Sequence, residues 1–331
     1  MKKSNFEKTL KIVLLTGIVS VTFTQCKKNK DETPTVSSTV GVTTASYSSP
    51  NDFFTKNGVQ LQTYTINGTT GGTFTSPQGT VVTIPANAFV TGGAAPITGN
   101  VKIEFKDIYK MSDMLLSNMS TQTATGPLKS AGEFFIKAIV NDTAVLLANG
   151  KKIQVEQPFN GQAKDSAMRP FVLKVDALAG AKGNPAWANN QMDGLTPSIT
   201  SYVYSLYQFG NPARSGTWCN SDNSNYFSGY LQTSLTIHPT DSTIAPFSNI
   251  FLVFTGVNSM VHVYQGYGSF NFPYLYAPVG LQCTVVTLTI NNNKVYSSFT
   301  PITISANKTV NVSVTETTTE AFKTKLNTLN L

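Results

Sequence analysis

The sequence predicts a mainly β protein: two antiparallel β-sandwich-like domains after a signal segment and a tether, with one short C-terminal helix. Two kinds of observation favour this fold class. Apolar and polar side chains alternate in VKIEF (101–105) and in TVNVSVT (309–315), and a period of two is typical of a half-buried strand. Asparagine-rich turn sequences separate such runs, whereas stretches with helical spacing are scarce.

Residues 1–25 are predicted to be a lipoprotein signal peptide. Lysines precede an apolar run of about 12 residues, Ile12 to Phe23, which is too short to span a bilayer but suits the core of a secretion signal. The run ends near Cys26, an arrangement that resembles a bacterial lipoprotein signal, in which the cysteine is lipidated and begins the mature chain. Cys26 is therefore the predicted lipidation site, and an ordinary signal peptide with an unrelated cysteine is the alternative.

Residues 26–58 are predicted to be the lipidated cysteine and a flexible tether. This stretch is rich in Ser, Thr and Pro and has few large apolar residues, so it buries too little surface to fold. Lysines of the signal and tether also account for much of the net charge of +7, because the chain beyond residue 58 has 16 basic and 13 acidic residues. A body with this balance has no basic stripe, and nucleic acid is excluded as a partner.

Residues 59–179 are predicted to form the first β-domain, with a turn at Asn67-Gly68 and a second at Asn149-Gly150. Its segment GGTFTSPQGTVVTIPANAFV (71–90), followed by ITGNVKIEFKDIY (97–109), resembles the ZU5 β-sandwich module. The residues that carry the pattern are Gly71, Gly72, Gly79, Ile84, Pro85, Ala88 and Phe89. The region after it is similar to Bacteroidetes surface lipoproteins. The resemblance implies a β-sandwich and a cell-surface setting, and it implies no activity.

A linker is predicted over 180–197 (GAKGNPAWANNQMDGLTP), before a second β-domain at 198–331. In that domain TVVTLTINNNKVYSSF (284–299) predicts a hairpin that turns at Asn291–Asn293. In 317–329, apolar residues at helical spacing follow capping threonines and predict the closing helix. Cys219 and Cys283 are a candidate disulfide, because an exported chain can keep one, and two separately buried thiols are the alternative.

The sequence offers little catalytic or metal-binding chemistry, and no cofactor is expected. Only two histidines are present, His238 and His262, and there is no Gly-x-Ser-x-Gly elbow. Two histidines and two cysteines are too few for a His₃ or Cys₄ zinc set. NSDNSN (220–225) has one carboxylate, Asp222, which is fewer than a calcium loop concentrates, so it is interpreted as a polar loop. We therefore expect no enzyme and no metal site.

One aromatic stretch, VYQGYGSFNFPYLYAPVG (263–280), is the candidate contact region. Aromatic residues at even positions share one face of an extended chain, and Pro273 argues for an edge strand or an open loop. An exposed aromatic ladder can stack on sugar rings or on a partner protein, whereas a sandwich core is the alternative use of the same pattern. The candidate contact residues are Tyr264, Tyr267, Phe270, Phe272, Tyr274 and Tyr276.

These observations predict a lipid-anchored cell-envelope lipoprotein, expected at the outer membrane, that acts as a non-catalytic interaction, adhesion or envelope-assembly module. The alternative is a carbohydrate-binding surface lipoprotein that uses exposed aromatics, and a secreted hydrolase is third. The expected partners are the membrane, through the lipid anchor, and a protein or polysaccharide at the cell surface. Exposed aromatics beside a groove would favour the carbohydrate, and buried ones the interaction module.

Overall fold

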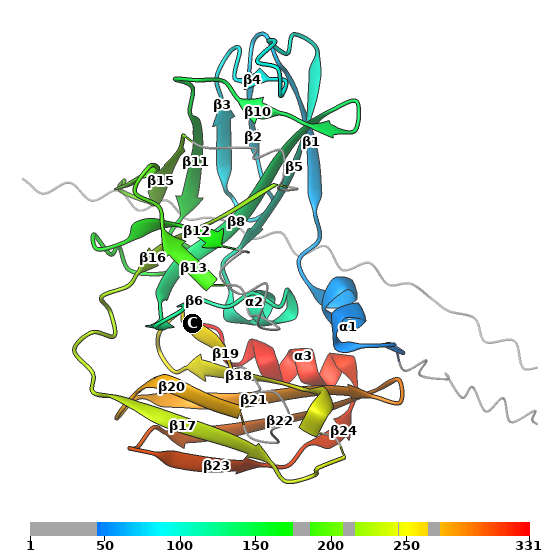
Figure 1. Cartoon of the computed structure of the whole chain (residues 1–331), viewed down its shortest axis with the longest axis vertical. Coiled ribbons are helices and arrows are strands. Elements are labelled where there is room, and N and C mark those ends of the chain that lie inside the picture. Colours follow the sequence, from blue (N-terminus) through cyan, green and yellow to red (C-terminus); the bar gives the residue numbers. More distant parts are fainter. Residues whose placement is uncertain (1–44, 175–185, 208–215, 244, 264–271) are drawn as a thin grey trace, which may run out of the picture. The chain divides into compact units, whose positions relative to one another are not determined.

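The alternating runs of the sequence form antiparallel sheets, as predicted. A computed structural model describes residues 45–174, 186–207, 216–243, 245–263 and 272–331 (Figure 1). The fold is mainly β, with 51% strand and 10% helix. Val101, Ile103 and Phe105 of the predicted strand at 101–105 are fully buried, and the charged residues between them are only partly buried. The period of two therefore identified the core face correctly.

Two sheets built largely from the first 223 residues pack face to face. The larger has, in spatial order, β1 (Gln62–Asn67), β5 (Asn100–Ile108), β8 (Lys129–Val140), β16 (Thr217–Asn223), β12 (Arg169–Lys174) and β13 (Ala186–Asn189), with β9 (Thr143–Ala144) paired to β8. The smaller has β14 (Gly194–Pro197), β15 (Ser201–Leu206), β11 (Ile153–Pro158), β3 (Val81–Ile84) and β2 (Gly72–Thr75). Apolar side chains of both sheets, such as Phe105, Phe134, Val155 and Tyr204, form one buried cluster between them.

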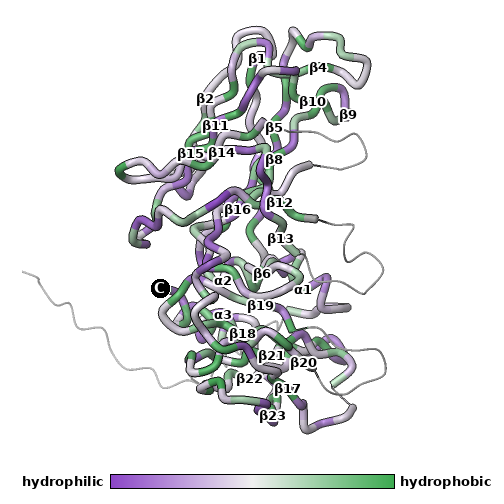
Figure 2. Tube along the Cα trace, turned by 60° about the vertical axis from the view of Figure 1, so that its left-hand side comes forward, coloured by the Kyte–Doolittle hydropathy of each residue, from purple (hydrophilic) through white to green (hydrophobic). Residues whose placement is uncertain are grey.

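The C-terminal part forms a second sandwich. One sheet has β20 (Phe272–Pro278), β17 (Gln232–Pro239) and β23 (Lys308–Val312), in that spatial order. The other has β19 (Met260–Val263), β18 (Ser248–Phe254), β21 (Gln282–Asn291), β22 (Lys294–Thr303) and β24 (Thr315–Thr317). β17 and β23 pair in parallel, whereas the other pairings of the described strands are antiparallel. Figure 2 shows the hydropathy of each residue along these strands.

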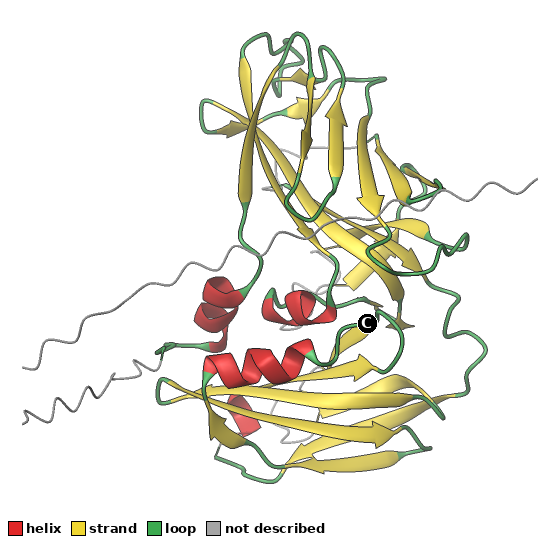
Figure 3. Ribbon diagram, turned by 180° about the vertical axis from the view of Figure 1, so that it is seen from behind, coloured by secondary structure: helices red, strands yellow, loops and turns green. Residues whose placement is uncertain are grey.

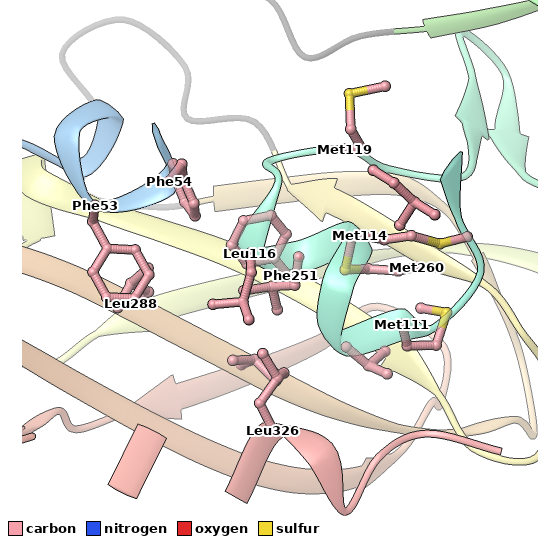
Figure 4. Packing of buried hydrophobic residues seen from close by; sticks show 14 of the residues in the cluster. Phe53, Phe54, Met111, Met114, Leu116, Met119, Phe251, Met260, Leu288 and Leu326 are labelled. Carbon is pink, nitrogen blue, oxygen red and sulfur yellow. The ribbon is translucent and has the colours of Figure 1, made fainter. Parts of the chain in front are cut away.

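Three helices cover the outer face of the five-stranded sheet β19-β18-β21-β22-β24 (Figure 3). They are α1 (Pro50–Asn57), α2 (Met111–Leu116) and α3 (Thr319–Asn327). Methionines of α2 and its flank pack with Met260 and with Phe251 of β18 (Figure 4). The closing helix at the C-terminal end is confirmed, since Thr318 caps α3 and accepts a hydrogen bond from the Ala321 amide.

Several short elements complete the described structure. β4 (Phe89–Val90) pairs with β10 (Leu146–Leu147), β6 (Gln122–Thr123) pairs with β7 (Gly126–Pro127), and η1 (Ala245–Phe247) precedes β18. The predicted hairpin turn is confirmed at Asn292 and Asn293, whose φ angles of 49° and 60° suit asparagine. The turn predicted at Asn149-Gly150 is present, with Gly150 at φ 75° and the Lys151 amide donating to the Ala148 carbonyl. It does not close a hairpin, because β10 before it and β11 after it pair with other strands. No helix in the described ranges is long and apolar enough to span a membrane.

The predicted end of the tether, at residue 58, is wrong. Residues 45–58 are folded: Ser49 caps α1, and Phe53 and Phe54 are buried against the outer face of the β18 sheet. The Ser49 hydroxyl accepts a hydrogen bond from the Asp52 amide, and Pro50 occupies the first helical position. A short capped helix therefore lies in a stretch whose composition predicts a tether. Residues 26–44, which include Cys26, lie outside the described residues.

The expected linker at 180–197 is also wrong where the structure describes it. β13 and β14 lie inside this range and pair with β12 and β15. Beyond it, β15 pairs with β11 and β16 pairs with β8, so residues up to Asn223 belong to the sheets of the first half. The chain changes to a new set of sheets only after β16, and Thr44–Leu331 form one compact unit.

Candidate ligand-binding cleft

A cleft of about 370 Å³ opens where five distant parts of the chain meet. Five of its lining side chains are amides: Gln78, Asn160, Gln162, Asn258 and Asn330. Pro77, Tyr109, Lys110 and Leu331 complete the described lining. The cleft is at the small end of the volumes that bind small molecules or a few residues of a partner.

The turn between β2 and β3 supplies one wall. Gly79, at φ 89°, closes this turn, as the sequence predicts, and its amide donates to the Ser76 carbonyl. The Gln78 amide nitrogen donates to the Asp107 carbonyl at 2.5 Å, while the Ser76 hydroxyl donates to the Asp107 carboxylate at 2.5 Å. Both bonds fix the turn to the end of β5, so that Gln78 reaches the cleft with its carbonyl oxygen unengaged.

Tyr109 forms the floor between β5 and α2. It is 3% exposed, and its hydroxyl hydrogen-bonds the Thr80 hydroxyl at 2.5 Å. Burial raises the pKa of Tyr109 well above that of a free phenol, so the ring stays neutral. The Asn258 amide nitrogen donates to the carbonyls of Tyr109, at 3.1 Å, and Ser130, at 3.0 Å. The β18–β19 turn is thereby tied to the end of β5 and the start of β8.

The opposite wall combines the segment after β11 with the segment after α3. Asn160 and Gly161 adopt positive φ angles of 49° and 82°, and the Gln162 amide donates to the Phe159 carbonyl to close the turn. The Asn330 side chain is held by Ser112 of α2, accepting from its amide at 2.9 Å and donating to its hydroxyl at 3.0 Å. These two segments therefore contribute an exposed turn and a fixed amide to the lining.

The free side-chain hydrogen-bonding groups of the described lining are neutral or cationic. The side chains of Asn160 and Gln162 make no hydrogen bond with other described residues, and each offers a carbonyl oxygen and an amino group. Lys110 adds an exposed ammonium, and no carboxylate side chain is among the described lining residues. This set suits a neutral or weakly anionic ligand that both donates and accepts hydrogen bonds, such as peptide backbone or a sugar.

None of the described residues of the predicted aromatic contact region lines this cleft. Tyr264, Tyr267 and Phe270 lie outside the described residues, as does the side chain of Phe272. β20 is an edge strand, which agrees with the argument from Pro273, because it pairs only with β17 in the described part.

The exposed aromatic ladder, however, is wrong for Tyr274. This side chain is 9% exposed, packs in the core of the second sandwich, and meets Tyr276 edge-on at 6.3 Å between ring centroids. Tyr276 is half-buried and packs against the same core. The sandwich-core alternative therefore applies to this part of the stretch.

The candidate disulfide is not formed. Cys219 and Cys283 are free thiols, each fully buried in a different apolar cluster, one in the first sandwich and one in the second. Burial raises the thiol pKa of both residues, to about 12 for Cys283, so neither forms a thiolate at neutral pH. The alternative of two separately buried thiols is correct.

The other residues considered for metal binding or catalysis do not form a site in the described structure. His262 is half-buried and stacks on Phe251 at 4.4 Å between ring centroids, and desolvation of its ring lowers its pKa to about 4. Within the described ranges, no three or more His, Cys, Asp or Glu side chains are grouped so that they could hold a metal ion. The polar loop expected over 220–225 is wrong for its first half, since Asn220–Asn223 end the buried strand β16.

No protein family, no curated protein and no solved structure matches the chain. The cleft was not found from the sequence, because its amides come from four separate segments that share no local pattern. Within one of these segments a signal was present: Asn160-Gly161 is a turn dipeptide directly after a strand. This dipeptide predicts an exposed turn, but it does not indicate which other segments lie beside the turn.

Proposed function

We propose that this protein is a non-catalytic interaction module of the cell envelope, lipid-anchored through Cys26, that binds a polar segment of a partner protein in the amide-lined cleft. The ZU5-like β-sandwich and the outer-membrane location belong to the same proposal. The observation that carries it is the set of free polar groups in the cleft, namely the side-chain amides of Asn160 and Gln162 and the side-chain oxygen of Gln78, with no carboxylate or histidine side chain among the described lining residues.

The chemistry of these side chains favours a peptide segment. An amide offers a donor and an acceptor side by side, which matches the alternating N–H and C=O groups of an extended backbone. Tyr109, the one aromatic residue among the described lining residues, is 3% exposed and presents no platform for stacking on a sugar ring. The fixed amides Asn258 and Asn330 keep the walls in place before binding, which lowers the entropic cost of association.

Photo-crosslinking in cells tests this proposal. A photoreactive amino acid at Gln162 of the full chain should form adducts that proteases remove and glycosidases leave intact. The matched control is the same amino acid at Gln154, an exposed position on β11 that is not among the cleft residues. Asn160→Gly, which removes the side chain and tolerates the positive φ of 49°, should reduce the adducts at position 162 several-fold with little change in the melting temperature, because truncation at the surface usually changes stability by less than ~0.5 kcal/mol. Adducts of equal yield at both positions, or none, would contradict it.

A carbohydrate ligand is the second candidate, and the mixed amide and lysine lining is what favours it. Amides bind sugar hydroxyls as readily as peptide groups, and Lys110 suits an acidic sugar. Adducts at position 162 that resist proteases and yield to glycosidases would support this function in place of the first. A glycan array probed with the protein and with Lys110→Ala then separates acidic from neutral sugars.

A further inference from the structure

Four polar side chains are buried together on one face of the seven-stranded sheet. Glu133 of β8 lies directly opposite Asn220 of β16, and Ser130 lies opposite Asp222. Directly opposed residues of an antiparallel pair point to the same face, and so do residues two apart on one strand. A bulge in β8, where Gly132 has φ 125°, shifts the register between the two pairs and keeps all four side chains on this face.

These side chains are fully enclosed and largely without partners. All four residues have 0% exposure. Among the described residues, the hydrogen-bond geometry leaves both carboxylate oxygens of Glu133 and of Asp222, and the Asn220 amide nitrogen, without a partner, although the nearby Ser130 hydroxyl partly offsets the rise in the pKa of Asp222. The Asn220 oxygen accepts from the Ser130 hydroxyl at 2.8 Å. Buried polar groups are nearly always paired in native proteins, so five unpaired atoms in one place indicate an occupant.

A neighbouring lysine does not supply the missing partner. Lys106 of β5 lies on the same face, because Ile108, two residues on, is opposite Glu133. Its ammonium is 5.8 Å from the centre of the Trp218 ring and makes no ion pair with Glu133, whose oxygens are both unpaired. Burial lowers the pKa of Lys106, although the nearby Glu133 partly offsets this. Among the described residues, neither carboxyl group therefore has a cation within ion-pair distance.

We infer that Glu133, Asp222 and Asn220 bind a divalent cation of the calcium type. Two carboxylates and an amide oxygen form an all-oxygen ligand set, which hard cations prefer, and calcium accepts bidentate carboxylates in irregular geometry. Turning the Asn220 amide about its axis places its oxygen toward the carboxylates and lets its nitrogen donate to Ser130. The cation joins β8 to β16 and so stabilises the pairing that ties residues 217–223 to the first half of the chain.

Calcium titration of the full chain tests this inference independently of the cleft. The chain, purified in detergent and treated with EDTA, should bind one Ca²⁺ in calorimetry. Its melting temperature should rise by about 5 °C at a concentration about 100-fold above Kd. Glu133→Gln and Asp222→Asn should each weaken binding at least about 10-fold and abolish the shift. The matched control Asp142→Asn, at an exposed turn with φ 58°, should bind as the natural chain does.

Two results would overturn the inference. The first is the absence of binding and of any thermal shift with calcium, magnesium or manganese. The second is a shift that both variants retain, which would place the cation elsewhere. Should either variant fail to fold, the natural chain remains informative, since terbium bound at this site should be excited through Trp218, and calcium should remove that emission. A terbium signal that is absent would equally overturn it.

Discussion

Phe53 of α1 packs edge-on against Phe322 of α3, with 5.9 Å between the ring centroids, so a segment near residue 50 and the C-terminal helix share one core. Both rings are buried, at 0% and 1% exposure. We expect Phe53→Ala to lower the free energy of unfolding by ~3–5 kcal/mol, because truncating a buried phenylalanine removes its contacts and leaves a cavity. Thermal or urea denaturation of the full chain measures this loss.

The control is Thr55→Ala in the same helix, an exposed position where we expect a change within ~0.5 kcal/mol. If residues 45–58 were a tether, both variants would have the melting temperature of the natural chain. That result would contradict the packing of α1 against the core.

Tyr274 is expected to be part of the scaffold. Its ring is buried in the core of the second sandwich, so Tyr274→Ala should cost ~3–5 kcal/mol of stability and lower the melting temperature. Leu275→Ala, on the opposite face of β20 and 62% exposed, should melt within about one degree of the natural chain. If the two variants had equal melting temperatures, the result would instead support the hypothesis that Tyr274 belongs to an exposed aromatic ladder.

The buried carboxyls predict stability that falls as pH rises. Burial raises the pKa of Glu133, the charge of Asp222 raises it further, and burial likewise raises the pKa of Asp222. The folded state therefore holds these protons more tightly than the unfolded chain does. The stability they contribute is complete below about pH 4 and is lost as the pH rises through the raised pKa values. In EDTA, the melting temperature should decline over this window.

Glu133→Gln should flatten that decline. Without an ionisable group opposite Asn220, we expect the variant to be more stable than the natural chain at pH 8, by on the order of 1–3 kcal/mol, and nearly equal to it at pH 4. Glu156→Gln, on an exposed position of β11, is the matched control and should follow the natural chain throughout. A variant that loses stability at pH 8 would mean that a partner compensates the charge of Glu133.

Two thiols should remain free after secretion. Cys219 packs in the first sandwich and Cys283 in the second, so a disulfide between them would require both cores to open. Alkylation in denaturant, with no reductant, should label both residues in the full chain. Mass spectrometry of the peptides checks this, and a linked peptide pair would contradict the strand arrangement. Native protein should resist the same reagent, because both thiols are buried and protonated.

Local patterns in the sequence predicted local structure well. The alternation of apolar and polar residues correctly predicted which face of β5 is buried. Consecutive asparagines predicted the turn between β21 and β22, and the capping threonines predicted the start of α3. Predictions failed where the outcome depends on distant partners. The 180–197 stretch is rich in Gly, Pro and Asn, yet two strands form in it because β12 and β15 are available to pair.

The same limit applies to the two sites. Asp222 is a lone carboxylate in the sequence, and only the pairing of β16 with β8 brings it close to Glu133. The cleft likewise gathers amides from segments such as Gln78 and Asn330, at opposite ends of the described chain. Alternation correctly placed Tyr274 on one face of a strand but does not say whether that face meets solvent or a second sheet.

Cys26 is predicted to be the point of membrane attachment. It follows a lysine-rich lead and a short apolar run, and the chain beyond it turns abruptly to polar residues. In cells, the natural chain should be cleaved, should take up labelled fatty acid and should sediment with membranes. The predicted acyl chains would hold it there, since each buried methylene contributes ~0.8 kcal/mol.

Cys26→Ser should abolish fatty-acid labelling and reduce membrane-bound processed protein at least about 10-fold, because the acyl chains supply the attachment. Processing must be followed together with fractionation, since an uncleaved apolar run keeps the precursor at the membrane by itself. The conservative control Thr24→Ser, two residues before the cysteine, should be cleaved, labelled and retained as the natural chain is. A processed Cys26→Ser chain that still sediments fully with membranes would show that attachment lies elsewhere in the protein.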